Sequence, residues 1–446
     1  MNIMDIINII KYIFLALFTI LSVFVNIQAI YYLILSLFGF GQAKKDYLPI
    51  EDQTRFLILV AAHNEEAVIG ATLENLKKIN YRKDLYDIYV VNDNSTDRTG
   101  EICDQYEIKH VDTIEQRFPR EGVGKPAGIQ YALRALGFEK LIEKYDCLMI
   151  LDADNHVDPD ILKELNCQFV QKGRPEAIQT YLDSKNATNS LSLGYALGYY
   201  NSNRFFQLSK YRLGLPNAIG GTGFIVRMDY LIKHGGFIFK SLTEDLELEI
   251  QIVRDGGRVL WNHFVRIYDE KPEKLKASLK QRTRWSQGHW YVAFTNCVPL
   301  MKEFFQVKGK RRWIILDQIF YLFNMGRSLH LLVALIGLVI VTFYRLIMNK
   351  TVGLLDVGLD IVDIIFGSSI FILINIFYQY FILLRYSVNH DSKLKFHFFK
   401  MFISLTYYSY TYIISQIAGF FKHRNQHTWV KTEHSKTRIE QIQLKK

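Results

Sequence analysis

Cysteine is scarce in this sequence, and the glycine-rich loops that hold phosphates in several enzyme classes are missing. The 446 residues contain four cysteines, with no CxxC pair and no histidines at metal-ligand spacing: Cys103, Cys147, Cys167 and Cys297. A disulfide framework or a zinc site is therefore not expected, and a reducing compartment fits. No GxGxxG follows the first predicted strand and no GxxxxGKS or GxxxxGKT occurs, which argues against a nicotinamide cofactor and an ATPase.

Charged residues are also few, at 22% of the chain, whereas hydrophobic residues make up 49% and aromatic residues 14%. The chain is roughly twice as long as one hydrophobic core usually supports, so more than one structural unit is expected. A total of 54 Lys and Arg against 44 Asp and Glu gives a net charge of +10. This excess alone would suit nucleic acid, an anionic membrane face or an anionic substrate.

Long uncharged segments exclude the nucleic-acid interpretation. The first, Tyr12–Ala43, has no charged residue, and it exceeds the ~20 residues that cross a bilayer. A cleaved signal peptide has a shorter apolar region, and a buried globular helix rarely runs this long without charge. Lys44 and Lys45 follow directly, which places the next domain in the cytoplasm.

Three further candidate spans lie near the C-terminus: Ser328–Tyr344, Ile364–Leu384 and Met401–Phe421. The basic and aromatic segment Lys302–Trp313 precedes them and is typical of a surface that lies on anionic headgroups. Basic residues favour the cytoplasmic side of a membrane, yet they flank the last span on both sides. Either one of these two flanks lies outside the cell, or Ile314–Tyr344 crosses the membrane twice with a break near Gly326-Arg327. A cytoplasmic tail is the favoured alternative.

The middle of the chain alternates predicted strands and helices. Phe56–Ala62, Asp87–Val91 and Cys147–Leu151 are short apolar runs, and the first two are separated by a helical stretch, Ala67–Lys78. Such alternation predicts an α/β domain with a doubly wound, mostly parallel sheet. Sheets of this kind bind ligands at the carboxyl ends of their strands.

Polar residues follow each predicted strand at that edge, in the runs 63–66, 92–97 and 152–155. Acidic groups at neighbouring strand ends repel one another unless a cation or hydrogen-bond donor groups lie among them. An Asp-x-Asp pair, here Asp152 and Asp154, suits Mg²⁺ or Mn²⁺ and leaves positions for diphosphate oxygens. Alone such a pair often makes only an Asx turn, but Asp93 at the next strand end favours the metal site.

Two further motifs carry candidate site residues. Ser241-Leu-Thr-Glu-Asp245 could be a capping box of Ser241 with Glu244 that opens a helix Leu246–Arg254, which does not exclude a catalytic Asp245. Gln281, Arg284 and Trp285 share one helix face. In one interpretation this face is exposed to solvent and only the tryptophan is packed. In the other, Gln281 and Arg284 donate hydrogen bonds to diphosphate oxygens, and the indole ring of Trp285 is a surface on which a sugar stacks.

These motifs together resemble a known family. AHNEE (62–66), VNDNSTD (91–97), DADN (152–155), GGTG (220–223), TED (243–245) and QRTRW (281–285) are similar to the processive family-2 glycosyltransferases, the membrane-embedded synthases of cellulose, hyaluronan, chitin and poly-N-acetylglucosamine. The similarity extends over about residues 54–290. The tail 428–436 more loosely resembles a cytoplasmic segment of these synthases. GGTG departs from the Cys- or Ser-containing loop of the cellulose and hyaluronan enzymes, which leaves the sugar open.

The resemblance implies a GT-A fold and a role for each matching residue. Asn64, Glu65, Asp93 and Lys125 match positions that hold the nucleotide, and Asp152 and Asp154 match the pair around Mg²⁺ or Mn²⁺ and the diphosphate. Asp245, within Thr243-Glu244-Asp245, matches the catalytic base. Gln281 and Arg284 match the residues that hold the diphosphate, and Trp285 matches the residue on which the acceptor sugar stacks.

The resemblance also implies an organisation and a reaction. The expected parts are an N-terminal transmembrane segment (1–43), a GT-A domain (44–298), an amphipathic interface region (299–327), C-terminal transmembrane helices (328–421) and a basic cytoplasmic tail (422–446), in a multi-pass protein of the plasma membrane. The expected reaction is inverting polymerisation of UDP-glucose or UDP-N-acetylglucosamine onto a growing β-linked glycan that the membrane segments export, with accessory export subunits or a homo-oligomer as further partners. The alternatives are transfer to a membrane lipid, giving a glycolipid, and a transport or scaffold subunit with a degenerate enzyme domain.

Overall fold

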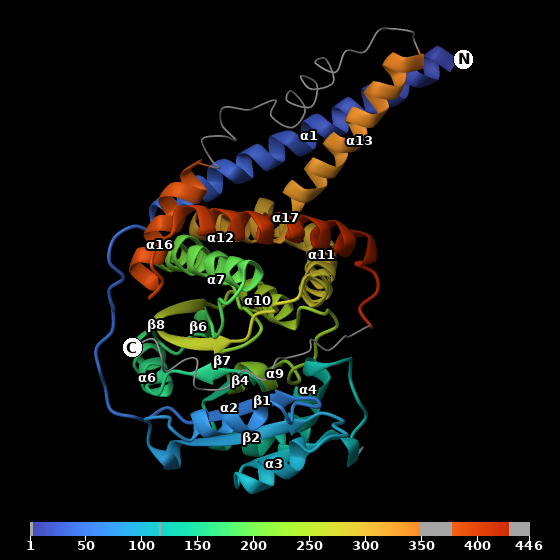
Figure 1. The fold of residues 1–446 in the computed structure, drawn as a ribbon. Helices are drawn as coiled ribbons and strands as arrows, with labels where there is room; N and C mark the ends of the chain where they lie inside the picture. The colour runs from blue at the N-terminus through green and yellow to red at the C-terminus, as the bar shows by residue number, and fades with distance from the viewer. Residues whose placement is uncertain (1–2, 116, 348–376, 428–446) are drawn as a thin grey trace.

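The computed structural model of the chain describes residues 3–115, 117–347 and 377–427. Figure 1 shows an α/β unit at the bottom and a group of helices across its upper side. Two long helices, α1 (Ile3–Leu37) and α13 (Gly326–Ile347), lie beside each other and extend away from this group. The predicted combination of an α/β domain with long apolar helices therefore describes the general architecture.

One eight-stranded sheet forms the α/β unit in the described part of the chain, in the order β3-β2-β1-β4-β7-β6-β8-β5. Its strands are β1 (Phe56–Ala62), β2 (Tyr86–Asn92), β3 (Lys109–Asp112), β4 (Cys147–Asp152), β5 (His156–Val157), β6 (Ala177–Ser184), β7 (Phe224–Arg227) and β8 (Val259–Asp269). Neighbours are parallel from β3 to β4 and between β6 and β8, whereas β7 and β5 run antiparallel to their partners. The three predicted strands and the mostly parallel sheet are confirmed.

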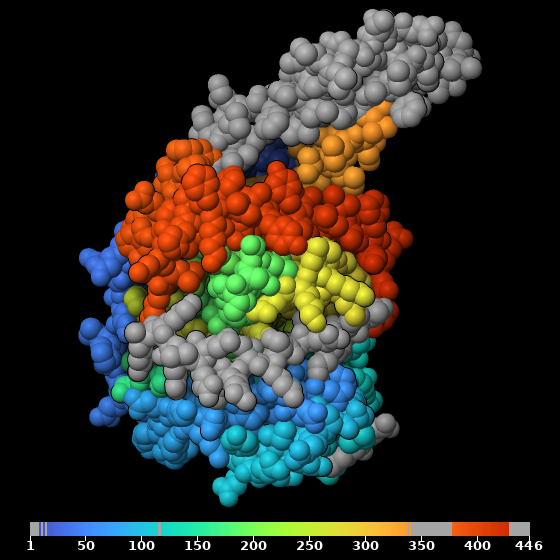
Figure 2. All heavy atoms as spheres, viewed as in Figure 1, coloured from blue at the N-terminus to red at the C-terminus, as the bar shows by residue number. Residues whose placement is uncertain are grey.

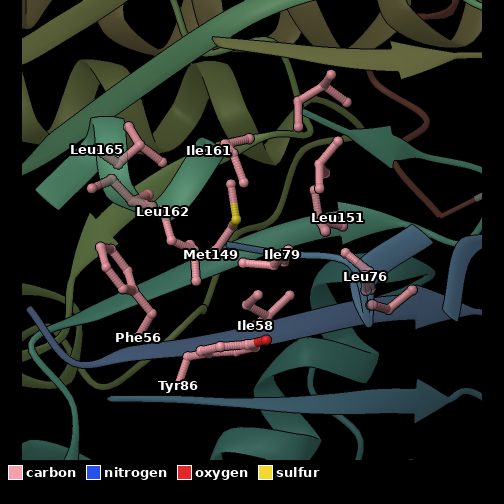
Figure 3. Packing of buried hydrophobic residues seen from close by; sticks show 14 of the residues in the cluster. Phe56, Ile58, Leu76, Ile79, Tyr86, Met149, Leu151, Ile161, Leu162 and Leu165 are labelled. Carbon is pink, nitrogen blue, oxygen red and sulfur yellow. The ribbon is translucent and has the colours of Figure 1, made fainter. Parts of the chain in front are cut away.

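Helices cover both faces of the sheet because its strands are apolar on both sides. Phe56, Ile58 and Val60 point into a core with α2 (Ile69–Leu76), α3 (Thr99–Gln105) and α6 (Ile161–Gln171). Figure 3 shows Phe56 and Ile58 of this core together with Leu76 of α2 and Leu162 and Leu165 of α6. The alternate residues Leu57 and Leu59 point to the other face. That face packs against α4 (Lys125–Leu136), α5 (Phe138–Lys144), α9 (Met228–Lys233) and α10 (Glu244–Arg254).

A further layer of helices lies above the sheet in Figure 1. It contains α7 (Ser190–Ser202), the π-helix η3 (Asn203–Leu208), α8 (Ser209–Leu213), α11 (Leu275–Gln306), α12 (Gly309–Leu322), the π-helix η4 (Tyr378–Leu383), α16 (Leu384–Asp391) and α17 (Phe398–Lys422). Two short 3₁₀ turns, η1 (Lys83–Leu85) and η2 (Thr113–Glu115), complete the described elements. The boundary expected at residue 298 falls inside the continuous helix α11, which therefore covers parts of both the expected GT-A domain and the expected interface region.

Within the described residues, one helical segment, Ala16–Leu37 of α1, is by itself long and apolar enough to cross a membrane. The helices α12 and α13 would count as a second span if they are taken together, with a bend of 48° between them. This bend lies near Gly326, where the sequence predicts a break. A multi-pass arrangement stays a prediction.

The three predicted C-terminal spans have different outcomes. Ser328–Tyr344 falls within α13, whereas Ile364–Leu384 lies mostly outside the described residues, as does the tail from residue 428. Met401–Phe421 does form a helix, α17, but α17 packs along α7 and α11 within the helix layer above the sheet. It is also not among the described helices that are apolar enough to span.

Candidate active site

The carboxyl ends of three parallel strands meet beside a large cavity. In the sheet register Asp152 at the end of β4 pairs with Ala61 of β1, and Asn92 of β2 pairs with Ala62. The cavity has a volume of about 1700 Å³. All predicted site residues except Asn64 line it, namely Glu65, Asp93, Lys125, Asp152, Asp154, Thr243, Glu244, Asp245, Gln281, Arg284 and Trp285.

Asn64 lies behind the cavity wall and supports the neighbouring loop. Its side-chain oxygen accepts a hydrogen bond of 2.7 Å from the backbone N–H of Thr96, and its own N–H donates to Ser95 Oγ at 3.0 Å. Asn64 has a φ of 56°, and asparagine tolerates this left-handed region better than most residues. The structure therefore gives Asn64 a supporting role for the loop after β2.

Asp93 is buried and is held by an arginine that the sequence analysis did not select. Arg120 donates two hydrogen bonds to its carboxylate, with N–O distances of 2.5 and 2.8 Å, and Thr113 Oγ1 donates a third at 2.8 Å. Gly128 of α4 packs so closely that an added Cβ would lie 3.1 Å from Asp93 Cγ. No local sequence pattern marks Arg120, because its partner lies 27 residues away.

Lys125 connects two sides of the cavity from the first turn of α4. Its Nζ donates to Asp152 Oδ1 at 2.5 Å and to the backbone carbonyl of Gly221 at 2.6 Å. Burial alone would lower the pKa of Lys125, but the negative charges of Asp152 and Glu244 outweigh burial and raise that pKa. Lys125 is therefore a firmly charged ammonium at the position where the predicted diphosphate would lie.

Asp152 and Asp154 offer carboxylate oxygens to the cavity without forming a dedicated metal cage. Asp154 is buried, and its Oδ2 accepts from the backbone N–H of Glu270 at 3.1 Å. Among the described residues no group of three His, Cys, Asp or Glu side chains is arranged to hold a metal ion. This donor set fits Mg²⁺ or a similar hard ion, which keeps waters and takes further oxygens from a bound diphosphate. The Asp152 carboxylate already pairs with one cation, because the ammonium of Lys125 lies 2.5 Å from its Oδ1.

Glu244 and Asp245 begin α10 and line the cavity. Thr243 is the N-cap, with no side-chain capping bond, and Ser241 Oγ is buried with no hydrogen-bond partner among the described residues. The suggested capping box of Ser241 with Glu244 is therefore wrong. Burial, followed by the charge of Glu244, raises the pKa of Asp245 to about 7, and burial also raises the pKa of Glu244. An acid of this pKa exchanges protons near neutral pH.

The QRTRW motif lies on α11, and its Gln281, Arg284 and Trp285 line the cavity. Burial lowers the pKa of Arg284, although the charges of Glu244 and Asp152 oppose this shift. Its Nε is buried and has no hydrogen-bond partner among the described residues. The ring of Trp285 lies 6.5 Å from that of Tyr195, edge to face. Arg284 therefore has an unused donor, and Trp285 offers an aromatic surface in the same cavity.

One further buried ion pair contributes to this cavity. Asp269, the last residue of β8, lines the cavity, and its carboxylate lies 2.6 Å from Lys271 Nζ. Burial raises the pKa of Asp269 to about 6, against the opposing charge of Lys271. Asp269 is not among the predicted site residues, because no strand was predicted in this part of the sequence. The pattern that predicts it is an acidic residue directly after the strand-like run VLWNHFVRIY.

The fold is an α/β fold of the GT-A type, and sequence comparison identifies the family. Residues 54–288 match the sequence model of the family described as "Glycosyltransferase like family 2". Because the match covers more than half of the chain, the protein belongs to this family and is a family-2 glycosyltransferase.

Several curated proteins are similar over long stretches. The probable glycosyltransferase YdaM of Bacillus subtilis is 26% identical over 387 residues, which are 84% of this chain and 86% of that protein. The poly-beta-1,6-N-acetyl-D-glucosamine synthase of Staphylococcus aureus is 24% identical, covering 66% of this chain and 67% of that protein. The beta-monoglucosyldiacylglycerol synthase of a Nostoc species is 27% identical, covering 52% of this chain and 48% of that protein.

One solved structure supports the fold over nearly the whole chain. The mannosyltransferase PcManGT from Pyrobaculum calidifontis, solved in complex with GDP-Man and Mn²⁺, superposes with a TM-score of 0.57 at 16% identity. The match covers 91% of this chain and 98% of that chain. The GT-A-like α/β fold that the motifs predict is thereby confirmed.

Proposed function

We propose that this protein is an inverting membrane glycosyltransferase that builds a β-linked polysaccharide from a UDP-sugar. The observation that carries the proposal is the lining of one cavity. Asp152, Asp245, Arg284 and Trp285 line it, and so do residues of the helices α1, α13 and α17. A donor site and an acceptor path are thus joined in one space.

Asp245 is the proposed base. The acceptor hydroxyl attacks the anomeric carbon of the donor sugar and gives its proton to the Asp245 carboxylate, while the bond from that carbon to the diphosphate breaks. The diphosphate leaves with the electron pair, and single displacement inverts the anomeric centre. A positioned carboxylate base typically contributes ~10²–10⁴-fold to the rate.

The leaving diphosphate gathers negative charge, and two cationic side chains are placed to receive it. Lys125 and Arg284 both line the cavity, and among the described residues the buried Nε of Arg284 has no hydrogen-bond partner. Donors held in place before the reaction stabilise such charge without reorganisation. Asp152 and Asp154 would hold Mg²⁺ or Mn²⁺, which would supply further charge neutralisation at the diphosphate.

The donor is proposed to be UDP-glucose or UDP-N-acetylglucosamine. The poly-N-acetylglucosamine synthase and the monoglucosyldiacylglycerol synthase among the relatives act on these two kinds of sugar by name. Asp93 and Glu65 line the far end of the cavity, where the nucleotide would lie. Because PcManGT was solved with GDP-Man, GDP-mannose is the competing donor that an assay has to include.

The polar and aromatic residues that α17 contributes to the cavity favour a polymer product. Tyr408, Tyr412 and Gln416 of α17 line the cavity, together with Asn324 before α13. Sugars stack on aromatic faces and bond to amides, so these groups suit a glycan that lengthens away from the catalytic acids. The product would leave between α17 and the helices α1 and α13, toward the membrane.

The second candidate function is transfer to a membrane lipid. Val25 and Ala29 of α1 and Leu331 of α13 also line the cavity. Apolar side chains of two long apolar helices would suit the acyl part of a lipid acceptor. A lipid acceptor would enter from the membrane and receive one or two sugars.

The deciding experiment uses purified full-length protein in nanodiscs with Mn²⁺ or Mg²⁺. Nucleotide release is measured with UDP-glucose, UDP-N-acetylglucosamine and GDP-mannose, with and without added diacylglycerol, and repeated after chelation with EDTA. Metal-dependent UDP release and a large product that β-glycosidases degrade would support the polysaccharide synthase. Release only with added lipid and a small organic-soluble product would support the glycolipid synthase. Release of GDP alone would overturn the UDP-sugar assignment.

A further inference from the structure

One buried acid beside the catalytic cavity has no part in the proposed reaction. Glu249 of α10 is fully buried and is not among the described residues that line the cavity. It follows Asp245 by four residues, so the two side chains share one face of the helix. Burial raises the pKa of Glu249 to about 8, against the opposing charge of Lys210. At pH 7 this side chain is therefore mostly neutral and acts through hydrogen bonds rather than through charge.

Glu249 holds the chain directly before the GGTG loop (220–223). Its Oε2 accepts a hydrogen bond of 3.2 Å from the backbone N–H of Ile219. The next backbone N–H, that of Gly220, donates to Gln179 Oε1 at 2.8 Å. Two buried side chains, one from α10 and one from β6, therefore fix the entry of this loop.

The same loop touches the proposed base. Gly221 has a φ of 78°, and a Cβ added to it would lie 3.2 Å from Asp245 Oδ2. Such a close approach in this backbone region requires a residue without a side chain. The face of α10 that carries Asp245 and Glu249 therefore meets the chain at two places, Ile219 and Gly221.

Charged and apolar groups of neighbouring helices pack around Glu249. The fully buried Lys210 of α8 and Asp317 of α12 lie 2.8 Å apart, and both charges act on Glu249. Leu246 and Ile250 of α10 pack into a core cluster with α11 and α12. In Figure 2 α17 (red) lies against α11 (yellow) on the visible side of this helix layer. In so dense a setting the Glu249 carboxyl has one well-defined place.

We propose that Glu249 is a positioning residue, which accepts from the Ile219 N–H, holds the loop at Gly221 against Asp245 and so fixes the orientation of the base. This inference rests on the proposed role of Asp245. Glu249 itself touches neither the donor nor the acceptor. The position requires an acceptor oxygen at the right place, and it does not require a negative charge.

Two variants separate the acceptor oxygen from the charge. Nucleotide release is measured with the full chain in nanodiscs at pH 7. Glu249→Gln keeps an oxygen that accepts from Ile219, so kcat and KM should stay near those of the unchanged protein. Glu249→Leu removes this acceptor, and kcat should fall roughly 10- to 100-fold with little change in KM for the donor, because a small displacement of a reacting group is costly. Full kcat in Glu249→Leu, or an equal loss in both variants, would overturn the inference.

Asn166→Leu is the control for lost stability alone. Asn166 is also fully buried, accepts from the backbone N–H of Thr54 at 3.0 Å and is not among the described residues that line the cavity. Both leucine variants should lower the unfolding temperature, but only Glu249→Leu should lower kcat when the assay is run well below that temperature. An equal loss of kcat in Asn166→Leu would show that the loss reflects stability and would overturn the inference.

An Asp245→Asn background separates this inference from the proposed function. If Glu249 acts through the base, Glu249→Leu should cost little further activity once the carboxylate is gone, since the two changes are then coupled. The same fold loss in both backgrounds would overturn the inference and leave the base assignment intact. Full activity of Asp245→Asn alone would instead remove the base, and the inference with it.

Gly221→Ala tests the same contact from the side of the loop if Glu249→Leu does not fold. The added methyl group would meet Asp245 Oδ2, so kcat should fall while KM for the donor changes little. This fall should also disappear in the Asp245→Asn background. Unchanged kcat in Gly221→Ala would show that the loop does not position the base, which would overturn the inference.

Discussion

Lys125 Nζ lies 2.5 Å from Asp152 Oδ1 and 2.6 Å from the carbonyl oxygen of Gly221, so one ammonium joins the Asp-x-Asp loop to the GGTG loop. Both loops line the catalytic cavity. A diphosphate that binds there would offer Lys125 new anionic oxygens and free the Asp152 carboxylate for a metal ion. We therefore expect donor binding and metal binding to be coupled.

Replacing Lys125 with Met is expected to weaken donor binding more than it changes the fold. A hydrogen bond to a charged group contributes about 1.5–3 kcal/mol, so donor affinity should fall roughly 10- to 100-fold. Titration calorimetry with UDP and Mn²⁺ measures the loss, and a thermal scan checks folding. Lys140→Met, at an exposed position of α5 outside the cavity, is the control. Unchanged affinity in Lys125→Met would show that Lys125 has no part in donor binding.

Asp245→Asn should abolish most turnover while it leaves donor binding intact. The amide keeps the shape of the side chain but cannot accept the acceptor proton, so kcat should fall ~10²–10⁴-fold. The matched control is Glu247→Gln in the same helix turn, whose side-chain oxygen would still accept from the backbone N–H groups of Lys240 and Ser241. Nucleotide release under saturating donor measures both variants. Equal rates for the two variants would contradict the role of Asp245.

The rate should depend on pH through the ionisation of Asp245. Burial raises its pKa to about 7, and only the ionised carboxylate accepts a proton. The rate should therefore be highest above pH 7 and fall toward tenfold per pH unit below that value. A profile of kcat/KM for nucleotide release between pH 5.5 and 9 tests this. A flat profile down to pH 5.5 would argue that Asp245 keeps an ordinary pKa or is not the base.

Arg284→Gln should lower kcat with little loss of thermal stability. Among the described residues Nε of the buried guanidinium has no hydrogen-bond partner, so its removal leaves no described partner of that atom unpaired. Loss of a donor to the leaving group typically costs about 10²–10³-fold in kcat. Lys280→Gln, exposed on the same helix, removes a charge without facing the cavity. Equal activity of both variants would remove Arg284 from the site.

A buried ion pair should make the helix α12 dependent on α8. Lys210 and Asp317 are fully buried with an N–O distance of 2.8 Å, and Tyr31 of α1 donates to Asp317 at 2.6 Å. Asp317→Ala leaves the buried ammonium without its partner and should cost about 3–5 kcal/mol. The double variant Lys210→Met, Asp317→Leu should be more stable than Asp317→Ala. Thermal unfolding in detergent is best compared at pH 6, where Glu249, whose pKa burial raises to about 8, is neutral.

If Asp317→Ala and the double variant unfold at the same temperature, the cost of the unpaired Lys210 charge is not the reason for the loss. The stability would then depend on the Tyr31 contact. A Tyr31→Phe variant, which removes only the hydroxyl, separates these two causes.

Short stretches of sequence predict the local structure of the catalytic domain and most of the residues around its cavity. The strands β1, β2 and β4 are apolar runs followed at once by polar motifs, and parallel pairing must bring such strand ends to one edge. The motif at 152–154 therefore lies at that edge, whereas 243–245 lies at the start of α10 and 281–285 lies within α11. This part of the fold follows from short-range pattern and from the geometry of parallel sheets.

The partners of these residues and the placement of α17 depend on long-range packing, which the sequence motifs do not predict. Arg120 reaches Asp93 and Lys271 reaches Asp269 through the arrangement of loops, which no spacing rule describes. Met401–Phe421 is an uncharged run of spanning length, so hydropathy predicts a transmembrane helix. Its small and polar residues, among them Ser404, Ser415 and Gly419, face the helices α7 and α11. Hydropathy averages over both sides of a helix, whereas packing depends on which side each residue occupies.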